Sequence, residues 1–147
     1  MATIKGNFTD SQSITITLTS VTNTSFALSS AIDNSTNLFI SALVQVTVKA
    51  NASGTATTGY CNVWLARSAD AGTTYDSTST ANKPGGLQLL GVIPVIANAE
   101  TVSATFDTAL LGALGTHWKI AVENESGATL DASVGSAKFS GVLYTSA

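Results

Sequence analysis

Residues 38–50, with the sequence LFISALVQVTVKA, alternate between two sets of side chains with the period of a β-strand. Six apolar residues share one face of the predicted strand, namely Leu38, Ile40, Ala42, Val44, Val46 and Val48. On the opposite face, Phe39 and Leu43 add apolar surface near the start. We therefore expect a strand with one face in a core, lying in the middle of a sheet or covered on both sides at its start.

The same alternation recurs before and after this stretch. Residues 13–20, SITITLTS, place Ile14, Ile16 and Leu18 on one face and hydroxyl side chains on the other. Further strands are predicted over residues 25–28, 60–66, 87–93, 102–106, 117–123 and 138–144, with a helical turn over 109–114. About eight short strands without a long amphipathic helix predict an all-β fold, an antiparallel β-sandwich of jelly-roll type. An immunoglobulin-like sandwich is the alternative.

The length of the chain bears on its domain organisation. A chain of 147 residues suits one domain and can bury a real core. The first dozen residues are polar and have no clear periodicity. We expect a flexible N-terminal arm over residues 1–12 and a single β-sandwich domain over residues 13–147.

The composition restricts the partners of the chain. Charged residues make up 10% of the sequence, the net charge is −3, and the few Lys and Arg residues are scattered, so a basic stripe for nucleic acid is not expected. The longest apolar run, 87–97, is short for a bilayer and is interrupted by Gly91 and Pro94, which predicts no membrane partner. Cys61 has no second cysteine to pair with, and the start lacks the apolar core of a signal peptide. We expect a chain that is made in a cytoplasm.

Residues 68–75, SADAGTTY, fit the pattern S-x-D-x-G-x-T followed by an aromatic residue. This pattern resembles the Asp-box hairpin of sialidases and related β-propellers. It predicts a structural turn closed by side chains that bond to backbone N–H groups, with glycine at a positive φ. The residues of this predicted turn are Ser68, Asp70, Gly72, Thr74 and Tyr75.

The resemblance to sialidases does not extend to their catalytic residues. A propeller needs one such hairpin in each blade, and the pattern occurs once in this sequence. Sialidases clamp the substrate carboxylate with three arginines, whereas Arg67 is the only arginine here. We therefore expect neither a propeller nor sialidase activity.

The remaining polar residues do not form a recognisable catalytic or metal-binding pattern. Glu123 and Glu125 are a close carboxylate pair beside a Ser-Gly turn, where a solvated turn is the simpler interpretation. His117 has no partner pattern and is expected at a sheet edge. Asp70 and Asp76 lack the dense oxygen ligands of a calcium loop. The sequence predicts no catalytic residues, no cofactor and no metal, and hence a protein that is not an enzyme.

The aromatic residues leave a binding function open. Tyr60, Trp64 and Tyr75 could line up near one end of a sheet and stack on a sugar. Aromatic residues at strand spacing more often pack in a core. Cys61 is expected as a small buried hydrophobic residue. The competing interpretations are therefore a glycan-binding module and an assembly protein.

Five blocks of the sequence resemble, in style and order, small virion proteins of tailed bacteriophages that decorate or cement the capsid. The blocks are TDSQSITITLTS, SSAIDNSTNLFISALVQVTVKA, YCNVWLARSADAGTTYD, LLGVIPVIANAETVSATFD and HWKIAVENESGATLDAS. The resemblance implies a jelly-roll or related sandwich, often a homotrimer, that sits where capsomers meet and clamps the major capsid protein.

From this resemblance we expect a structural protein on the capsid surface of a virion, assembled in the host cytoplasm. The N-terminal arm would become ordered on the shell. The alternative is a tail-fibre or baseplate module that binds host-surface carbohydrate, because such modules share the same composition.

Overall fold

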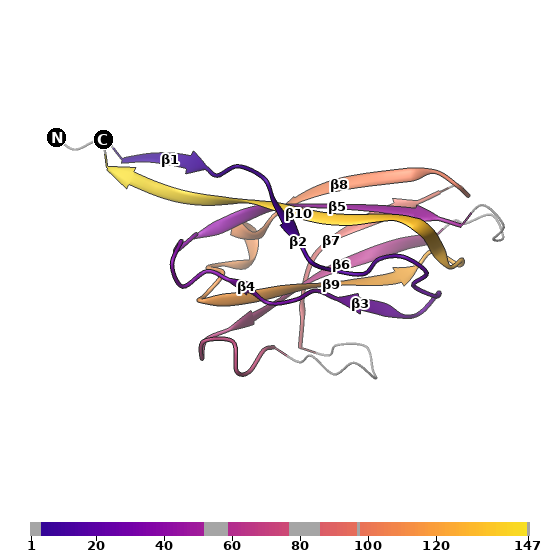
Figure 1. Ribbon diagram of the computed structural model, residues 1–147, viewed down its shortest axis with the longest axis horizontal. Coiled ribbons are helices and arrows are strands. Elements are labelled where there is room, and N and C mark those ends of the chain that lie inside the picture. Colours follow the sequence, from indigo (N-terminus) through magenta and orange to yellow (C-terminus); the bar gives the residue numbers. More distant parts are fainter. Residues whose placement is uncertain (1–3, 52–58, 77–85, 97, 147) are drawn as a thin grey trace.

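The computed structural model describes residues 4–51, 59–76, 86–96 and 98–146, which form two antiparallel β-sheets packed as a sandwich (Figure 1). The first sheet has the order β1 (Ile4–Phe8), β10 (Leu130–Ser146), β5 (Ser41–Ala50) and β8 (Thr101–Asp107), with β2 (Gln12–Ile14) also beside β10. The second sheet has the order β3 (Phe26–Leu28), β9 (His117–Glu125), β6 (Gly59–Ser68) and β7 (Gln88–Val95), with β4 (Ile32–Asp33) also beside β9.

The strand order is that of a jelly roll. Strands β1 and β2 pair with the same partner, β10, and strands β3 and β4 both pair with β9. If each of these pairs is counted as one interrupted strand, the sheets have the orders 1-8-3-6 and 2-7-4-5, which is the jelly-roll arrangement of eight strands. The predicted fold class is therefore confirmed, and the two interruptions explain why ten strands are found in the described part of the chain.

The predicted strand over residues 13–20 is shorter than expected. Only β2, which ends at Ile14, pairs with β10, although burial still alternates as far as Leu18. After Ile14 the chain leaves the first sheet for the second, where β3 pairs with β9. The side chain of Leu18 fills the space over Gly135, where a Cβ atom would lie 2.7 Å from the Leu18 Cβ. The alternating pattern reflected contact with the core and not strand pairing along the whole stretch.

The start of the predicted strand over residues 38–50 has the opposite orientation from the one expected. Leu38 and Ile40 are exposed, whereas Phe39 is buried. The reason is Asn34, whose Oδ1 accepts from the Phe39 N–H at 2.8 Å and whose Nδ2 donates to the Phe39 carbonyl at 2.9 Å. This clamp ends a turn in which Leu38 has a positive φ of 53°, and regular pairing of β5 begins only at Ser41.

The core lies between the two sheets. From β5, the side chains of Ala42, Val44, Val46, Val48 and Ala50 are completely buried. They meet a second row that the sequence pattern also predicted, which includes Val63, Leu65, Trp118, Ile120 and Val122.

The other predicted elements differ mainly at their ends. A 3-10 helix, Thr108–Leu111, occupies part of the predicted helical turn. Strand β10 begins at Leu130, eight residues before the predicted start. Leu130 and residues 135–137 pair with β5, and the register shifts between Leu130 and Gly135. None of the described helical segments has the length and hydropathy of a membrane-spanning helix.

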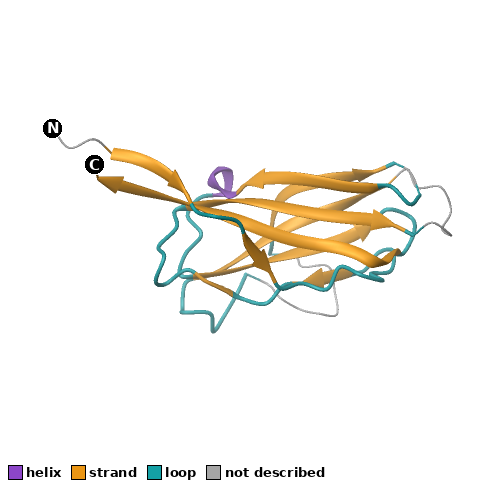
Figure 2. Cartoon of the chain, turned by 45° about the horizontal axis from the view of Figure 1, so that its top comes forward, coloured by secondary structure: helices purple, strands orange, loops and turns teal. Residues whose placement is uncertain are grey.

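The predicted N-terminal arm is, in its described part, mainly strand β1. Residues Ile4–Phe8 pair with the last residues of β10, so that Ile4 lies opposite Ser146 and Phe8 opposite Val142. The two strands extend together beyond the body of the sandwich (Figures 1 and 2). We call this two-stranded element, residues 4–8 and 142–146, the terminal ribbon.

Candidate functional site

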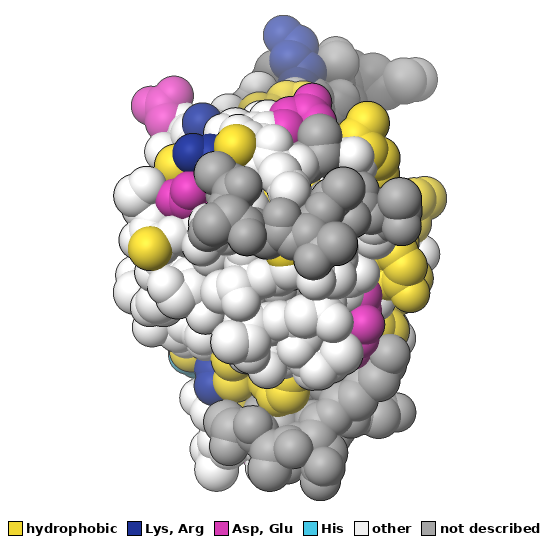
Figure 3. Space-filling model, turned by 90° about the vertical axis from the view of Figure 1, so that its right-hand side faces the viewer, with side chains coloured by type: hydrophobic (Ala, Val, Ile, Leu, Met, Phe, Trp, Pro, Cys, Tyr) yellow, Lys and Arg dark blue, Asp and Glu magenta, His cyan; other side chains and the backbone are white. Residues whose placement is uncertain are grey.

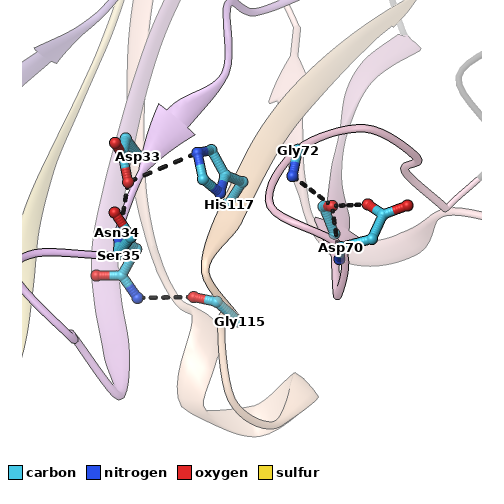
Figure 4. A network of polar contacts seen from close by, with 8 residues as sticks. Asp33, Asn34, Ser35, Asp70, Gly72, Gly115 and His117 are labelled. Atoms are coloured by element: carbon cyan, nitrogen blue, oxygen red, sulfur yellow. Dashed lines mark hydrogen bonds and ion pairs between the residues drawn. The ribbon is translucent and has the colours of Figure 1, made fainter.

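The Asp-box-like segment forms a turn held by its own side chains (Figure 4). The Ser68 Oγ accepts from the Gly72 N–H at 2.9 Å and from the Asp70 N–H at 3.3 Å, and donates to the Asp70 Oδ1 at 2.7 Å. The same carboxylate oxygen accepts from the Thr74 N–H at 2.8 Å. Gly72 has a φ of 84°, as the pattern predicts. These four contacts close the turn.

The electrostatics of the turn agree with a structural role. The Thr74 backbone N–H, followed by the Ser68 hydroxyl, lowers the pKa of Asp70 from 3.8 to about 2. The carboxylate is therefore ionised near neutral pH, and its Oδ1 accepts from both Ser68 and Thr74. Asp76, at the other end of the segment, accepts from the Arg67 backbone N–H at 3.2 Å.

His117 contacts this turn instead of standing alone at an edge. Its Nε2 lies 3.6 Å from the Asp33 Oδ1 (Figure 4), and its ring lies against Gly72, where a Cβ atom would be 3.1 Å from the His117 Cδ2. The Tyr75 hydroxyl flanks the same glycine at 3.1 Å from that position. Burial, followed by the charges of Asp70 and Asp33, raises the pKa of Tyr75.

His117 therefore joins the end of β4, at Asp33, to the Asp-box-like turn, at Gly72. Figure 4 shows Asp33 and His117 side by side, with the Asp70 turn on the other side of the histidine. Ser68, which lies opposite His117 on the neighbouring strand, already donates its hydroxyl to Asp70 at 2.7 Å. The geometry is that of a bridge between two loops and not that of a nucleophile with its base.

The expectation that Glu123 lies in a solvated turn is wrong. Glu123 is 3% exposed and lies within β9, which continues to Glu125. Its Oε2 accepts from the Asn62 Nδ2 at 2.9 Å and from the Trp64 Nε1 at 3.1 Å. The sequence pattern placed the strand end two residues too early, and a carboxylate inside a strand can bond across to the next strand, here β6.

The three aromatic residues considered for glycan binding do not form one platform. Trp64 and Tyr75 are half-buried and pack in the same small cluster on the outer face of the second sheet, and Lys119 lies 4.1 Å from the centre of the Tyr75 ring. Tyr60 lies outside that cluster and is 45% exposed. The structure thus gives Trp64 and Tyr75 packing roles and leaves the Tyr60 ring accessible.

The candidate thiol and metal ligands have structural surroundings. Cys61 is completely buried, and burial raises the pKa of its thiol to about 12, so it is not a nucleophile near neutral pH. Among the described residues, no three His, Cys, Asp or Glu side chains gather where they could hold a metal ion.

The described part of the chain has two exposed apolar surfaces that involve both sheets. The first is one face of the terminal ribbon, which carries Ile4, Phe8, Val142 and Tyr144 and is called the ribbon face. The second lies on the outer face of the second sheet and is called the β7 stripe; it consists of Tyr60, Leu89, Val92, Pro94 and Ile96. In the view of Figure 3, hydrophobic side chains gather along one edge of a face on which charged side chains are few.

One strand of the ribbon face has a weak pattern in the sequence that can be recognised once the structure is known. The stretch IKGNF alternates between apolar and polar residues, as a strand with one apolar face would. Its partner strand lies more than 130 positions later, so no local pattern indicates that the two would meet.

Comparisons with known proteins find solved structures that resemble this chain only distantly. No protein-family model and no curated protein sequence matches this chain. A structure of the CBM22-1–GH10 modules of the Clostridium thermocellum xylanase 10B with xylohexaose aligns with 94% of this chain and 26% of that chain, at 12% identity and a TM-score of 0.43. A structure of infectious bursal disease virus, strain Gt, aligns with 98% of this chain and 37% of that chain, at 12% identity and a TM-score of 0.20. The chain thus spans only a minor part of either protein, and TM-scores this low show nothing about its function.

Proposed function

We propose that this chain is a structural protein of a bacteriophage virion, a decoration or cement protein that binds the major capsid protein as a homotrimer and stabilises the shell. The observation that carries the proposal is the pair of exposed apolar surfaces, the ribbon face and the β7 stripe, on a chain with only 10% charged residues. Contiguous apolar surface of this kind is typical of protein–protein contact. The resemblance of the sequence blocks to phage decoration proteins indicates which assembly is involved.

The buried and turn-forming polar side chains described above stabilise the fold, which supports a structural role for the protein. Ser68, Asp70 and Asn34 hold turns, and Glu123 ties β9 to β6. They position loops and strands of the sandwich. A protein of this kind acts through binding energy alone.

Assembly on a symmetric shell increases this binding energy without new kinds of contact. A trimer that touches several capsid subunits makes its second and third contacts intramolecularly, which raises the overall affinity by a factor of about 10²–10⁴. Salt screens ionic contacts, whereas it weakens apolar ones little. A low-charge interface should therefore hold at high ionic strength.

The test uses undecorated shells made from the major capsid protein of the same phage. Purified protein is mixed with these shells, and the bound fraction is measured by sedimentation over a salt series. We expect saturable binding that persists at about 1 M salt, where the screening length falls to roughly 3 Å, and a higher melting temperature of the decorated shells. Release by moderate salt would contradict the apolar contact, and no binding to the shells would contradict the proposal.

A second candidate function is a tail-fibre or baseplate module that binds host-surface carbohydrate. The exposed ring of Tyr60 favours it, because Glu125 lies directly opposite on β9 and could accept from sugar hydroxyls. The test is a glycan array with the wild type, Tyr60→Ala and the control Tyr144→Ala, whose ring is also exposed but lies in the terminal ribbon. Binding lost only in Tyr60→Ala would support this function, and an array with no bound glycan would contradict it.

A further inference from the structure

We propose that the ribbon face of one copy of this chain packs on the β7 stripe of a second copy, so that the copies join head to tail. The inference rests on the proposed function only for the closed, three-membered ring. The contact itself depends on the two surfaces described below.

One face of the terminal ribbon carries exposed apolar side chains, and the other carries Lys5, Asn7, Leu143 and Thr145, of which Leu143 packs against the core. In its register, Gly6 lies opposite Tyr144 and Phe8 opposite Val142, so the large apolar side chains point to the same side. The Tyr144 ring covers Gly6, since a Cβ atom there would lie 3.5 Å from the ring. On the other face, the Asn7 Nδ2 donates to the Thr145 Oγ1 at 2.9 Å.

The apolar side of the terminal ribbon is unusually exposed. The exposed fractions are 73% for Ile4, 65% for Phe8 and 60% for Tyr144. A two-stranded ribbon is marginally stable at best without further packing. The ribbon projects from the body of the sandwich (Figure 2), so its apolar face has little of its own molecule to pack against. We infer that this face packs against another molecule.

The β7 stripe offers a surface of the matching kind. Residues 92–95 of β7 alternate in burial: Val92 and Pro94 are exposed, whereas Ile93 and Val95 are completely buried in the core. Strand β7 is at the edge of its sheet, but Pro94 has no N–H to donate, which disfavours the addition of a further strand. The stripe is therefore suited to packing face to face, and not to extension of the sheet.

The positions of the two surfaces favour a second copy as the occupant. On β10, Ala137 and Phe139 face the core, so the alternate residues Val142 and Tyr144 lie on the outer side of the first sheet. The β7 stripe lies on the outer side of the second sheet. One molecule cannot bring these opposite sides together, whereas a head-to-tail contact uses both surfaces of every copy and can close into a ring.

Charge also matches between the two surfaces. The terminal ribbon carries Lys5 and no acidic residue. The β7 stripe is bordered by Glu125, which lies opposite Tyr60 on the neighbouring strand. Lys5 lies opposite Thr145, on the other side of the ribbon from the ribbon face. Its charge and that of Glu125 therefore give the head-to-tail contact a weak attraction from outside the apolar surface.

The first experiment is a complementation test by light scattering and sedimentation velocity. Phe8→Asp removes the ribbon face, Val92→Asp removes the β7 stripe, and Ser103→Asp, on the exposed outer face of the first sheet, is the control. We expect each of the first two variants to be monomeric and the control to have the mass of the wild type. An equimolar mixture of Phe8→Asp and Val92→Asp should form a one-to-one dimer and nothing larger, because one intact contact remains.

The second experiment tests the contact without disrupting it. Cys61 is buried, so a Phe8→Cys, Val92→Cys double variant should form disulfides only between the introduced residues of different copies. We expect a covalent ladder on a non-reducing gel, and none for the control pair Ser103→Cys, Val92→Cys. A Val92→Asp protein with the mass of the wild type, or a double variant that stays uncrosslinked, would overturn the inference.

The outcomes also separate this inference from the proposed function. A wild-type protein that is monomeric but still binds shells overturns the head-to-tail contact and leaves the decoration role intact. A crosslinked ring that binds no shell supports the head-to-tail contact and overturns the decoration role. A Phe8→Asp protein that keeps its mass but no longer binds shells would assign the terminal ribbon to the capsid protein and overturn the contact between copies.

Discussion

At the scale of single residues, the Asp-box-like turn depends on one buried hydroxyl. Ser68 is 2% exposed, and its Oγ accepts two backbone N–H groups. Ser68→Ala leaves both donors without this acceptor and should lower the free energy of unfolding by about 1–2 kcal/mol. Urea unfolding measures the loss, with the exposed Ser136→Ala as a control that should stay within roughly 0.5 kcal/mol of the wild type. An unchanged Ser68→Ala protein would show that the turn is not held by its side chains.

Two carboxylates give the fold a dependence on pH. The Thr74 backbone N–H holds the pKa of Asp70 at about 2, and the Ser133 hydroxyl does the same for Asp131. Both values lie below the ordinary 3.8 of the unfolded chain, so the unfolded state binds more protons as the pH falls. The stabilisation is therefore complete above about pH 4 and is lost progressively towards pH 2.

This dependence is testable with variants that cannot titrate. In the double variant Asp70→Asn, Asp131→Asn, we expect the melting temperature to fall less steeply between about pH 4 and pH 2 than it does in the wild type. Thermal melts followed by circular dichroism provide the slopes. Parallel curves for the two proteins would mean that other carboxylates cause the acid sensitivity.

At the scale of elements, periodicity predicted the strands well and their ends poorly. The alternation of residues 42–50 was enough to place β5 in the core, because each core side chain is two positions from the next. It failed at Leu38 and Phe39, where the Asn34 side chain clamps the backbone and reverses which residue faces inward. The burial of Glu123 was missed for a similar reason, since its acceptor role depends on Asn62 and Trp64 across the sheet. Contacts between distant segments have no period in the sequence.

The reversed orientation of Phe39 has a consequence for strand β10. A Cβ atom at Gly141 would lie 2.5 Å from the Phe39 ring, and Phe39 also packs edge to face against Phe139 at 6.2 Å. Gly141→Ala should therefore force the ring to move and cost about 1–3 kcal/mol. The matched control is Gly6→Ala, where the added methyl group would make an ordinary contact of 3.5 Å with the Tyr144 ring.

Urea unfolding of both glycine variants measures this difference. If Gly141→Ala is as stable as the wild type, Phe39 does not occupy its place over β10. If Phe39→Leu in the Gly141→Ala background recovers stability, the clash with the ring is the cause of the loss.

At the scale of the whole molecule, the jelly roll and the terminal ribbon differ in how far the sequence predicts them. Eight alternating segments are enough to favour a sandwich, because sheets with one apolar face must pack in pairs. The terminal ribbon joins residues near the two ends of the described chain, and each of its strands looks unremarkable alone. Its apolar face exists only after the strands pair, which is why the sequence suggested a polar arm.

If copies join through the terminal ribbon, the stability of the protein should depend on its concentration. When a ring unfolds to separate chains, a higher protein concentration favours the folded ring by mass action. Its melting temperature therefore rises with protein concentration, whereas that of a monomer does not. We expect this rise in the wild type and in Ser103→Asp over a roughly hundredfold range of concentration, and no rise in Phe8→Asp, which keeps the core but lacks the ribbon face. Because Phe8 is 65% exposed, its replacement should leave the melting temperature at low concentration close to that of the wild type. A wild-type melting temperature that does not change with concentration would show that the exposed apolar surfaces are not buried between copies, and only a partner such as the capsid protein would then remain to cover them.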